Sequence, residues 1–241
     1  MGLGLIAGVI NTLAGGGSNL TVPALMVVGM PPDVANATNR VGVFLQAIVG
    51  ANRFKKHKKL PTQDFKAVII PMLIGSVIGG AFASYAPQAL LKYLLLGSML
   101  TVAIVILIRP NVIAPPADTV PFTVQEKPQA LWWLLLVGFY GGFVQGGVGF
   151  IMITTFAGVL RYDLVSSNAL KVLCTVFFTG IALAIFIMND QVRWIPGLIL
   201  AIGTMTGAVI GVKMALKISQ QSIKWFLFIM TLVASLAAIF F

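Results

Sequence analysis

Eight apolar runs separated by short linkers decide what this sequence can fold into. Most are about 20 residues long, which is the length that an α-helix needs to cross a hydrocarbon layer of roughly 30 Å. The mean hydropathy is +1.00 and only 9% of residues are charged, which excludes an ordinary soluble domain. We therefore predict an all-α, multi-pass membrane protein. The runs cover Gly2 to Met30, Ala35 to Phe54, Phe65 to Tyr85, Ala89 to Ile108, Leu131 to Leu160, Val165 to Met188, Trp194 to Lys217 and Ile223 to Phe241.

The first run is too long for one helix across a membrane, and a glycine-rich stretch interrupts it. As one helix it would reach well over 40 Å, at about 1.5 Å per residue. Gly15, Gly16 and Gly17 are poor helix formers, whereas Ser18, Asn19 or Thr21 can cap a new helix that has Pro23 in its first turn. Backbone that is exposed at this depth must be buried in protein or line a polar cavity, as in the broken helices of many transporters.

The sequence contains an internal repeat. A shift of 132 residues places Gly15 on Gly147 and Gly17 on Gly149 without any gap. The same shift aligns Asn36-Ala37 with Asn168-Ala169, Gly75 to Gly79 with Gly207 to Gly211, and Lys92 with Lys224. One offset that holds four separate clusters in register indicates two copies of one unit, each with a glycine-broken run followed by three ordinary runs.

The charged loops predict how the two copies are oriented. The loop from Arg53 to Lys59 is basic and is expected inside the cell, whereas its counterpart from Ile185 to Gln191 has no Lys or Arg and contains Asp190. This contrast predicts two inverted repeats, each with a re-entrant, glycine-broken helix pair and three transmembrane helices. Eight transmembrane helices in two parallel repeats are the alternative. The repeats span 1–110 and 131–241, joined by a linker at 111–130.

After each broken run, the next helix opens with polar residues on one face. In the first copy the steps 36, 39, 43 and 46 carry Asn36, Asn39 and Gln46, and in the second Asn168, Lys171, Thr175 and Thr179 share a face. Two explanations remain open: the asparagines cap helices while Arg40 and Lys171 extend to the membrane surface, or these residues bind a ligand.

The chemistry of the two polar faces and of the glycine breaks suits an anion. Helix N-termini carry partial positive charge and free N–H groups, amides and hydroxyls donate hydrogen bonds, and a cation balances charge. Acidic residues lie only in loops or at run ends, which argues against a buried carboxylate proton relay. The predicted substrate-binding residues are Gly15, Gly16, Gly17, Ser18, Asn19, Asn36, Thr38, Asn39, Arg40, Gln145, Gly147, Gly149, Asn168 and Lys171.

The sequence lacks the signatures of an enzyme, a metal site or a cofactor site. The single histidine, His57, lies in the basic loop, and no nucleophile elbow, paired carboxylates or phosphate-binding glycine loop is present. The net charge of +10 comes largely from loop residues, which indicates membrane topology and contact with lipid head groups rather than nucleic acid. We therefore expect no catalytic residues, metal or cofactor.

Several motifs resemble the TauE/SafE family of membrane permeases. They are Ala14 to Ser18, Leu20-Thr21-Val22-Pro23, Gly29-Met30-Pro31-Pro32 and Ala35 to Asn39, with a weaker echo from Gly141 to Lys171. The second copy departs from the pattern, with Thr155 in place of the proline and Arg161-Tyr162-Asp163 in place of the Gly-x-Pro turn.

The resemblance implies a secondary transporter in the bacterial cytoplasmic membrane that exports sulfite or small organosulfonates by alternating access. A passive anion channel is the alternative, followed by a membrane enzyme or accessory protein. Without the resemblance, the residues predict only that the substrate is a small anion, and they do not determine the coupling ion or the oligomeric state.

Overall fold

A computed structural model describes residues 1–62, 64–108, 115 and 119–217. The described residues form helices joined by short loops, with no strand among them. The predicted run from 223 to 241, residues 109–110 at the end of the first repeat and residues 111–114 and 116–118 of the predicted linker lie outside the described part. The helices are α1 (Gly2–Leu13), α2 (Ser18–Val27), α3 (Pro32–Lys56), α4 (Phe65–Tyr85), α5 (Gln88–Ile108), α6 (Gln129–Phe143), α7 (Val148–Ile153), the π-helix η1 (Thr154–Val159), α8 (Leu164–Met188) and α9 (Trp194–Lys217).

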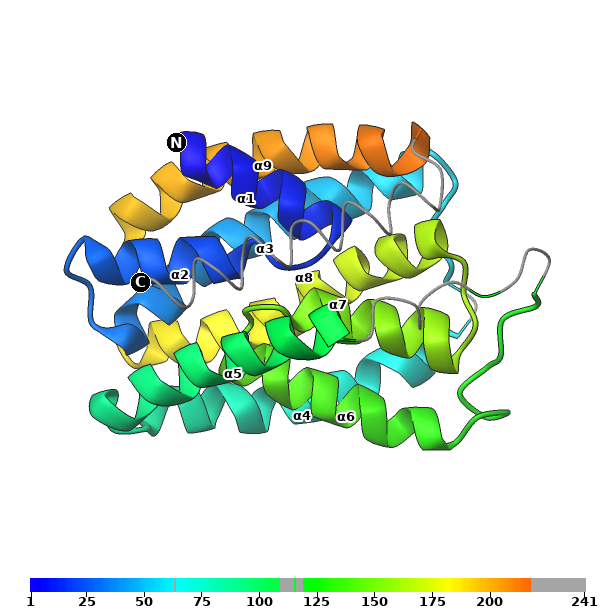
Figure 1. Cartoon of the computed structure of the whole chain (residues 1–241), viewed down its shortest axis with the longest axis horizontal. Helices are drawn as coiled ribbons and strands as arrows, with labels where there is room; N and C mark the ends of the chain where they lie inside the picture. Colours follow the sequence, from blue (N-terminus) through cyan, green and yellow to red (C-terminus); the bar gives the residue numbers. More distant parts are fainter. Residues whose placement is uncertain (63, 109–114, 116–118, 218–241) are drawn as a thin grey trace.

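The first glycine break turns the chain back on itself. At 12 and 10 residues, α1 and α2 are each about 15 to 18 Å long, too short to cross a membrane alone. In Figure 1, α1 runs from the N-terminus to the middle of the molecule and α2 returns to the same end. Gly15 adopts a left-handed φ of 82°, and a Cβ at Gly17 would overlap the carbonyl of Ala7. The turn therefore requires glycine at both positions.

Two local details of this turn differ from the sequence prediction. Gly17 occupies the N-cap position of α2, and no side chain caps the helix, so the prediction that Ser18, Asn19 or Thr21 does so is wrong. Pro23 lies inside α2, beyond the first turn. The polar side chains are used elsewhere, because Ser18 and Thr21 bond to Asn39 of α3. Tertiary hydrogen bonds have replaced the local cap.

The second break forms a similar hairpin from the other end of the molecule. In Figure 1, α6 runs toward the middle, and α7 with η1 returns to the end where α6 began. Gly147 at this turn has a φ of 76°. The returning segment changes from α- to π-helical at Thr154, and the Thr155 hydroxyl donates back to the Ile151 carbonyl. In α2 a proline lies at the corresponding place.

The helices and turns recur at the 132-residue spacing found in the sequence. The bounds of α3 and α8 are separated by this interval at both ends. Three pairs of residues at the same spacing have positive φ: Gly15 with Gly147, Gly29 with Arg161, and Lys58 with Asp190. In Figure 1, α3 and α8 run in opposite directions, as do α4 and α9.

Each short inward helix packs on the second long helix of the other half. Helix α1 packs on α9 and α6 packs on α4, with close backbone approach at glycines. A Cβ at Gly75 would overlap the carbonyl of Leu135, and one at Gly207 would overlap that of Leu5. The glycines of α4 and α9 therefore allow close helix packing.

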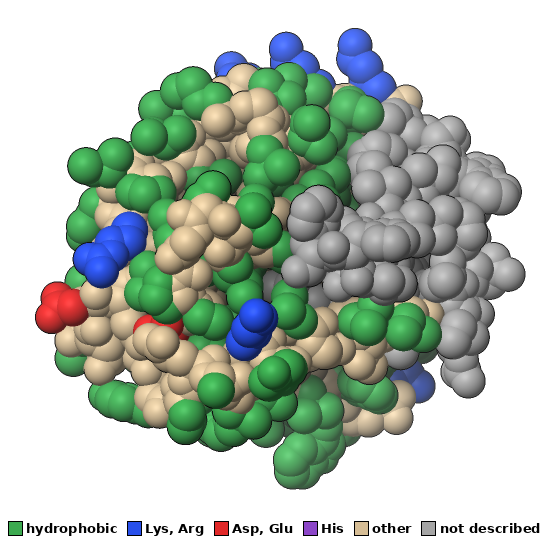
Figure 2. Space-filling model, turned by 60° about the vertical axis from the view of Figure 1, so that its left-hand side comes forward, with side chains coloured by type: hydrophobic (Ala, Val, Ile, Leu, Met, Phe, Trp, Pro, Cys, Tyr) green, Lys and Arg blue, Asp and Glu red, His purple; other side chains and the backbone are tan. Residues whose placement is uncertain are grey.

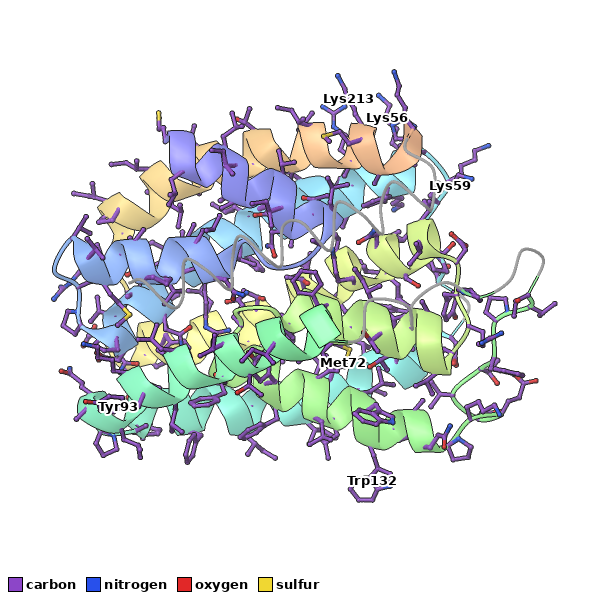
Figure 3. All side chains as sticks on the ribbon, in the orientation of Figure 1. Lys56, Lys59, Met72, Tyr93, Trp132 and Lys213 are labelled. Atoms are coloured by element: carbon purple, nitrogen blue, oxygen red, sulfur yellow. The ribbon has the colours of Figure 1, made fainter. Side chains whose placement is uncertain are left out.

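The surface is that of a membrane protein. In the described chain α4, α8 and α9 are long and apolar enough to cross a bilayer. Helix α3 is as long, but it carries Asp33, Arg40 and a basic last turn. Hydrophobic side chains cover much of the described surface visible in Figure 2. Lys56, Lys59 and Lys213 gather at one end of the molecule, and Tyr93 lies at the other end (Figure 3).

Candidate functional site

The tips of the two hairpins meet in the middle of the molecule. A Cβ at Gly15 would overlap the backbone of Gly149, so the two turns touch through their main chains. A small cavity of about 10 Å³ lies beside this contact, on the scale of one water molecule. Both long central helices, α3 and α8, contribute to its wall. The cavity is lined by Asn11, Gly15, Val43, Gln46, Ala47, Gln145, Val148, Gly149, Lys171, Val172 and Thr175.

Lys171 of α8 caps the C-terminal end of α1 at this cavity. Its ammonium donates to the carbonyls of Asn11 at 3.0 Å and Thr12 at 2.8 Å, and to the Asn168 amide oxygen at 2.8 Å. The side chain is only 2% exposed. The ammonium satisfies carbonyls that the broken helix leaves unpaired and opposes the negative end of its dipole. Lys171 does not extend to the membrane surface.

Arg40 of α3 plays the corresponding part at the end of α6. Its guanidinium donates to the carbonyls of Gly141 at 2.9 Å, of Gly142, and of Phe143 at 3.4 Å. It also lies 4.9 Å from the centre of the Phe186 ring, a cation–π contact. The side chain is fully buried and does not line the cavity. Each cation thus comes from one half of the chain and caps the broken helix of the other half.

This capping leaves the positive ends of the broken helices as the uncompensated charge. The breaks expose two C-termini, which the cations neutralise, and the N-termini of α2 and α7. Among the described residues, no hydrogen bond uses the amides of Gly16, Gly17, Gly146 or Gly147. Free N–H groups at the positive end of a helix dipole favour an anion. The local field at the hairpin tips therefore suits negative charge.

Two asparagines of α3, Asn36 and Asn39, connect this long helix to the two hairpins through hydrogen bonds. Asn39 donates to the Ser18 hydroxyl and accepts from Thr21, while Asn36 donates to the Phe143 carbonyl. Asn36 and Asn168 both lie inside helices, and Asp163 caps α8 instead, so the helix-cap explanation for these asparagines is wrong. Buried amide pairs of this kind hold the breaks in one geometry.

Two glutamine side chains leave hydrogen-bonding capacity beside the cavity. Gln145 donates to the Thr179 hydroxyl at 2.9 Å, and its amide oxygen has no partner among the described residues. The amide oxygen of Gln46 is likewise buried without a partner. Because a carboxamide can be rotated end for end, either group can present N–H to a ligand once its partner is exchanged.

Of the fourteen residues predicted to bind substrate, four line the cavity and ten do not. Thr38 accepts from the Arg193 amide at the edge of the fold, and Asn19 is buried in α2. Sequence reasoning omitted Asn11, although a lone amide in an apolar half-helix next to the break was a usable signal. Gln46 and Thr175 had the right helical phase but were not included. The four that line it are Gly15, Gln145, Gly149 and Lys171.

A match to a known family covers almost the whole chain. Residues 1–238 match the family described as sulfite exporter TauE/SafE. The chain belongs to the TauE/SafE family. Within the described residues of this TauE/SafE member, no group of three His, Cys, Asp or Glu side chains is placed to hold a metal ion.

Curated relatives with the same general assignment come from several bacteria. The chain is 26% identical to a probable membrane transporter protein of Haemophilus influenzae over 95% of this chain and 89% of that protein. It is 28% identical to the probable membrane transporter protein YfcA of Escherichia coli K12, over 96% and 85%. It is 25% identical to YdhB of Bacillus subtilis, over 99% and 96%. No solved structure matches the chain. This TauE/SafE member is therefore a multi-pass membrane protein related to transporters.

Proposed function

We propose that the chain is a secondary transporter that exports sulfite or a small organosulfonate across the bacterial cytoplasmic membrane by alternating access. The observation that carries the proposal is the buried Lys171 ammonium at the meeting point of two helix breaks, beside glutamine amides with unused capacity. An anion there would meet a cation, amide donors and two positive helix ends.

The choice of sulfur oxyanions rests on the family description together with the size of the site. Sulfite and sulfonate groups each carry three oxygens around one sulfur, which suits several N–H donors converging from different elements. The donors are backbone and side-chain amides gathered around one small cavity, so they favour a compact charged group over a long substrate. Catalytic chemistry has no part in the proposal.

Movement of the hairpins follows from the size of the cavity. A cavity of about 10 Å³ cannot hold an anion of four or more heavy atoms, so binding requires the tips at Gly15 and Gly149 to separate. The same contact disfavours a passive channel, because it closes the path between the two hairpins. Opening toward one side at a time would carry the anion across.

The inverted-repeat topology belongs to this proposal and is supported by helix direction and charge. The hairpins enter from opposite ends of the molecule in Figure 1, and the basic ends of α3 and α9 share one end in Figure 3. Positive residues favour that end for the cytoplasm. Reporter fusions after Met30 and after Leu160 should report opposite compartments. Reports from the same compartment would instead support two parallel repeats.

Flux into or out of liposomes tests the function. Purified protein in vesicles should move sulfite, sulfoacetate or taurine with saturation, and sulfate should serve as the comparison oxyanion. Lys171→Gln should lower flux, whereas Lys213→Gln at the surface of α9 should not. Flux that increases linearly with concentration would indicate a channel, and the absence of flux for every anion would contradict the proposal.

A further inference from the structure

A second polar feature lies outside the central site, on the outer face where α3 and α8 pass each other. It is a groove of about 570 Å³ at the basic end of the molecule. We propose that this groove binds one anionic phospholipid, with the phosphate held by Lys55 and Lys58 and the upper acyl chain on the groove floor. The inference does not depend on the transport function.

The rim of the groove supplies the positive charge. Lys55 lies in the last turn of α3, and Lys58 follows just beyond its end. The Lys58 amide donates to the Lys55 carbonyl at 3.0 Å, and this bond fixes the backbone turn between the two lysines. Asn52 and Thr62 add neutral donors, and none of the described residues that line the groove is acidic. Two ammonium groups with no acid in the described lining favour a head group of net negative charge over a zwitterionic one.

The floor of the groove is apolar. It is formed by Ala51 of α3, Leu60 of the following loop and Leu173 of α8. Ala51 belongs to a buried hydrophobic cluster, and the other two pack against that cluster while remaining partly exposed. A charged rim above an apolar floor at the end of membrane helices matches the boundary between lipid head group and acyl chain.

Size and polarity favour a lipid over a free oxyanion. A free phosphate fills only a small part of 570 Å³ and gains nothing from an apolar floor. A phospholipid uses both parts of the groove. The groove is also separate from the central cavity, because Ala47 and Val172 of the cavity wall belong to the packed cluster beneath Ala51.

Native mass spectrometry of the detergent-purified full chain tests the assignment. The protein is supplied with equal amounts of phosphatidylglycerol and phosphatidylcholine, and retained lipid is measured. The wild-type protein should retain phosphatidylglycerol at least several-fold over phosphatidylcholine. Lys55→Gln combined with Lys58→Asn should abolish this preference, and asparagine tolerates the positive φ of 55° at this position. The matched control, Lys213→Gln with Lys217→Gln, removes two charges from α9 at the same end and should keep the preference.

A local probe distinguishes this groove from general attraction to basic protein. Leu173→Trp places a fluorophore on the floor, and its additional emission should be quenched more by brominated phosphatidylglycerol than by brominated phosphatidylcholine. Equal quenching by both lipids, or equal loss of preference in the α9 control, would overturn the proposal. Displacement of the lipid by millimolar inorganic phosphate would identify a free oxyanion site and would also overturn it.

Discussion

The two helix breaks are built alike, but the cations that cap them differ in kind and in exposure to the cavity. Lys171 holds the end of α1 with one ammonium on a flexible stem and lines the cavity. Arg40 holds the end of α6 with a planar guanidinium on three carbonyls, stacked by Phe186, and lies away from the cavity.

The Lys171 ammonium can change hydrogen-bond partners, whereas the Arg40 guanidinium holds the end of α6 in one position. An ammonium can rotate and exchange carbonyl acceptors for an anion at small cost, whereas a guanidinium fixed by several bonds and a ring cannot. The two cations are not at equivalent positions, because the 132-residue shift pairs Lys171 with Asn39 and Arg40 with Val172. We infer that the α1 break carries the substrate contact and the α6 break carries the scaffold.

The largest expected effect is on stability at the α6 break. Arg40→Gln removes the donors to the buried Gly141 and Gly142 carbonyls and should cost about 3 to 5 kcal/mol, because those groups lose their partner in a dry interior. The Phe143 carbonyl, in contrast, keeps its bond from Asn36. Thermal unfolding in detergent should show a much lower midpoint than for Lys171→Gln. Equal midpoints for the two variants would remove the distinction between the breaks.

The next effect is on transport at the α1 break. Lys171→Gln keeps donors for the Asn11 and Thr12 carbonyls but loses the charge, so folding should survive while flux falls tenfold or more, equivalent to about 1.4 kcal/mol or more. Lys171→Arg should recover part of the flux. Concentration series in liposomes measure this effect, and wild-type flux in the glutamine variant would place the substrate elsewhere.

A smaller effect on stability is expected at the turns that follow the two hairpins. Gly29 and Arg161 both have positive φ, and a Cβ at Gly29 would meet no atom, so only backbone strain separates glycine from other residues there. Gly29→Ala should destabilise by about 1 to 2 kcal/mol, whereas Arg161→Gly should be neutral or stabilising. Denaturation midpoints measure both changes. A stabilising Gly29→Ala would show that the backbone at this turn is not left-handed.

The smallest expected effect is on the KM of a variant in which the second break is made more like the first. Gln145 corresponds to Leu13 in the repeat. Gln145→Leu therefore removes an amide from the cavity and introduces the residue found at the equivalent position of the first half. The KM for the transported anion should rise about three- to tenfold, equivalent to about 0.7 to 1.4 kcal/mol, with little change in maximal flux. Gln191→Leu, a glutamine outside the cavity, is the control. An unchanged KM would exclude Gln145 from substrate contact.

The sequence was sufficient to predict the parts of the fold that depend on periodicity. The apolar runs within the described residues correspond to helices, and the glycines at 15 and 147 marked both turns because no other residue adopts those backbone angles as easily. The 132-residue register was visible in the sequence and recurs in the bounds of α3 and α8.

What the sequence could not give was the set of partners across the two halves. Asn36 and Phe143 lie more than 100 positions apart, as do Lys171 and Thr12, and nothing local determines that they meet. For the same reason, side chains expected to cap α2 were found bonded to α3, and Asn11 was overlooked although it lines the cavity. Local patterns identify polar residues, and tertiary packing decides which of them face the ligand.

An experimental structure determined at saturating sulfite or sulfoacetate would show where the anion binds. We expect the turns at Gly15 and Gly149 to have separated and the anion to lie between them, with the Lys171 ammonium turned from a carbonyl to an anion oxygen. A bound anion elsewhere, with the two glycines still touching and Lys171 still on Asn11 and Thr12, would contradict this expectation.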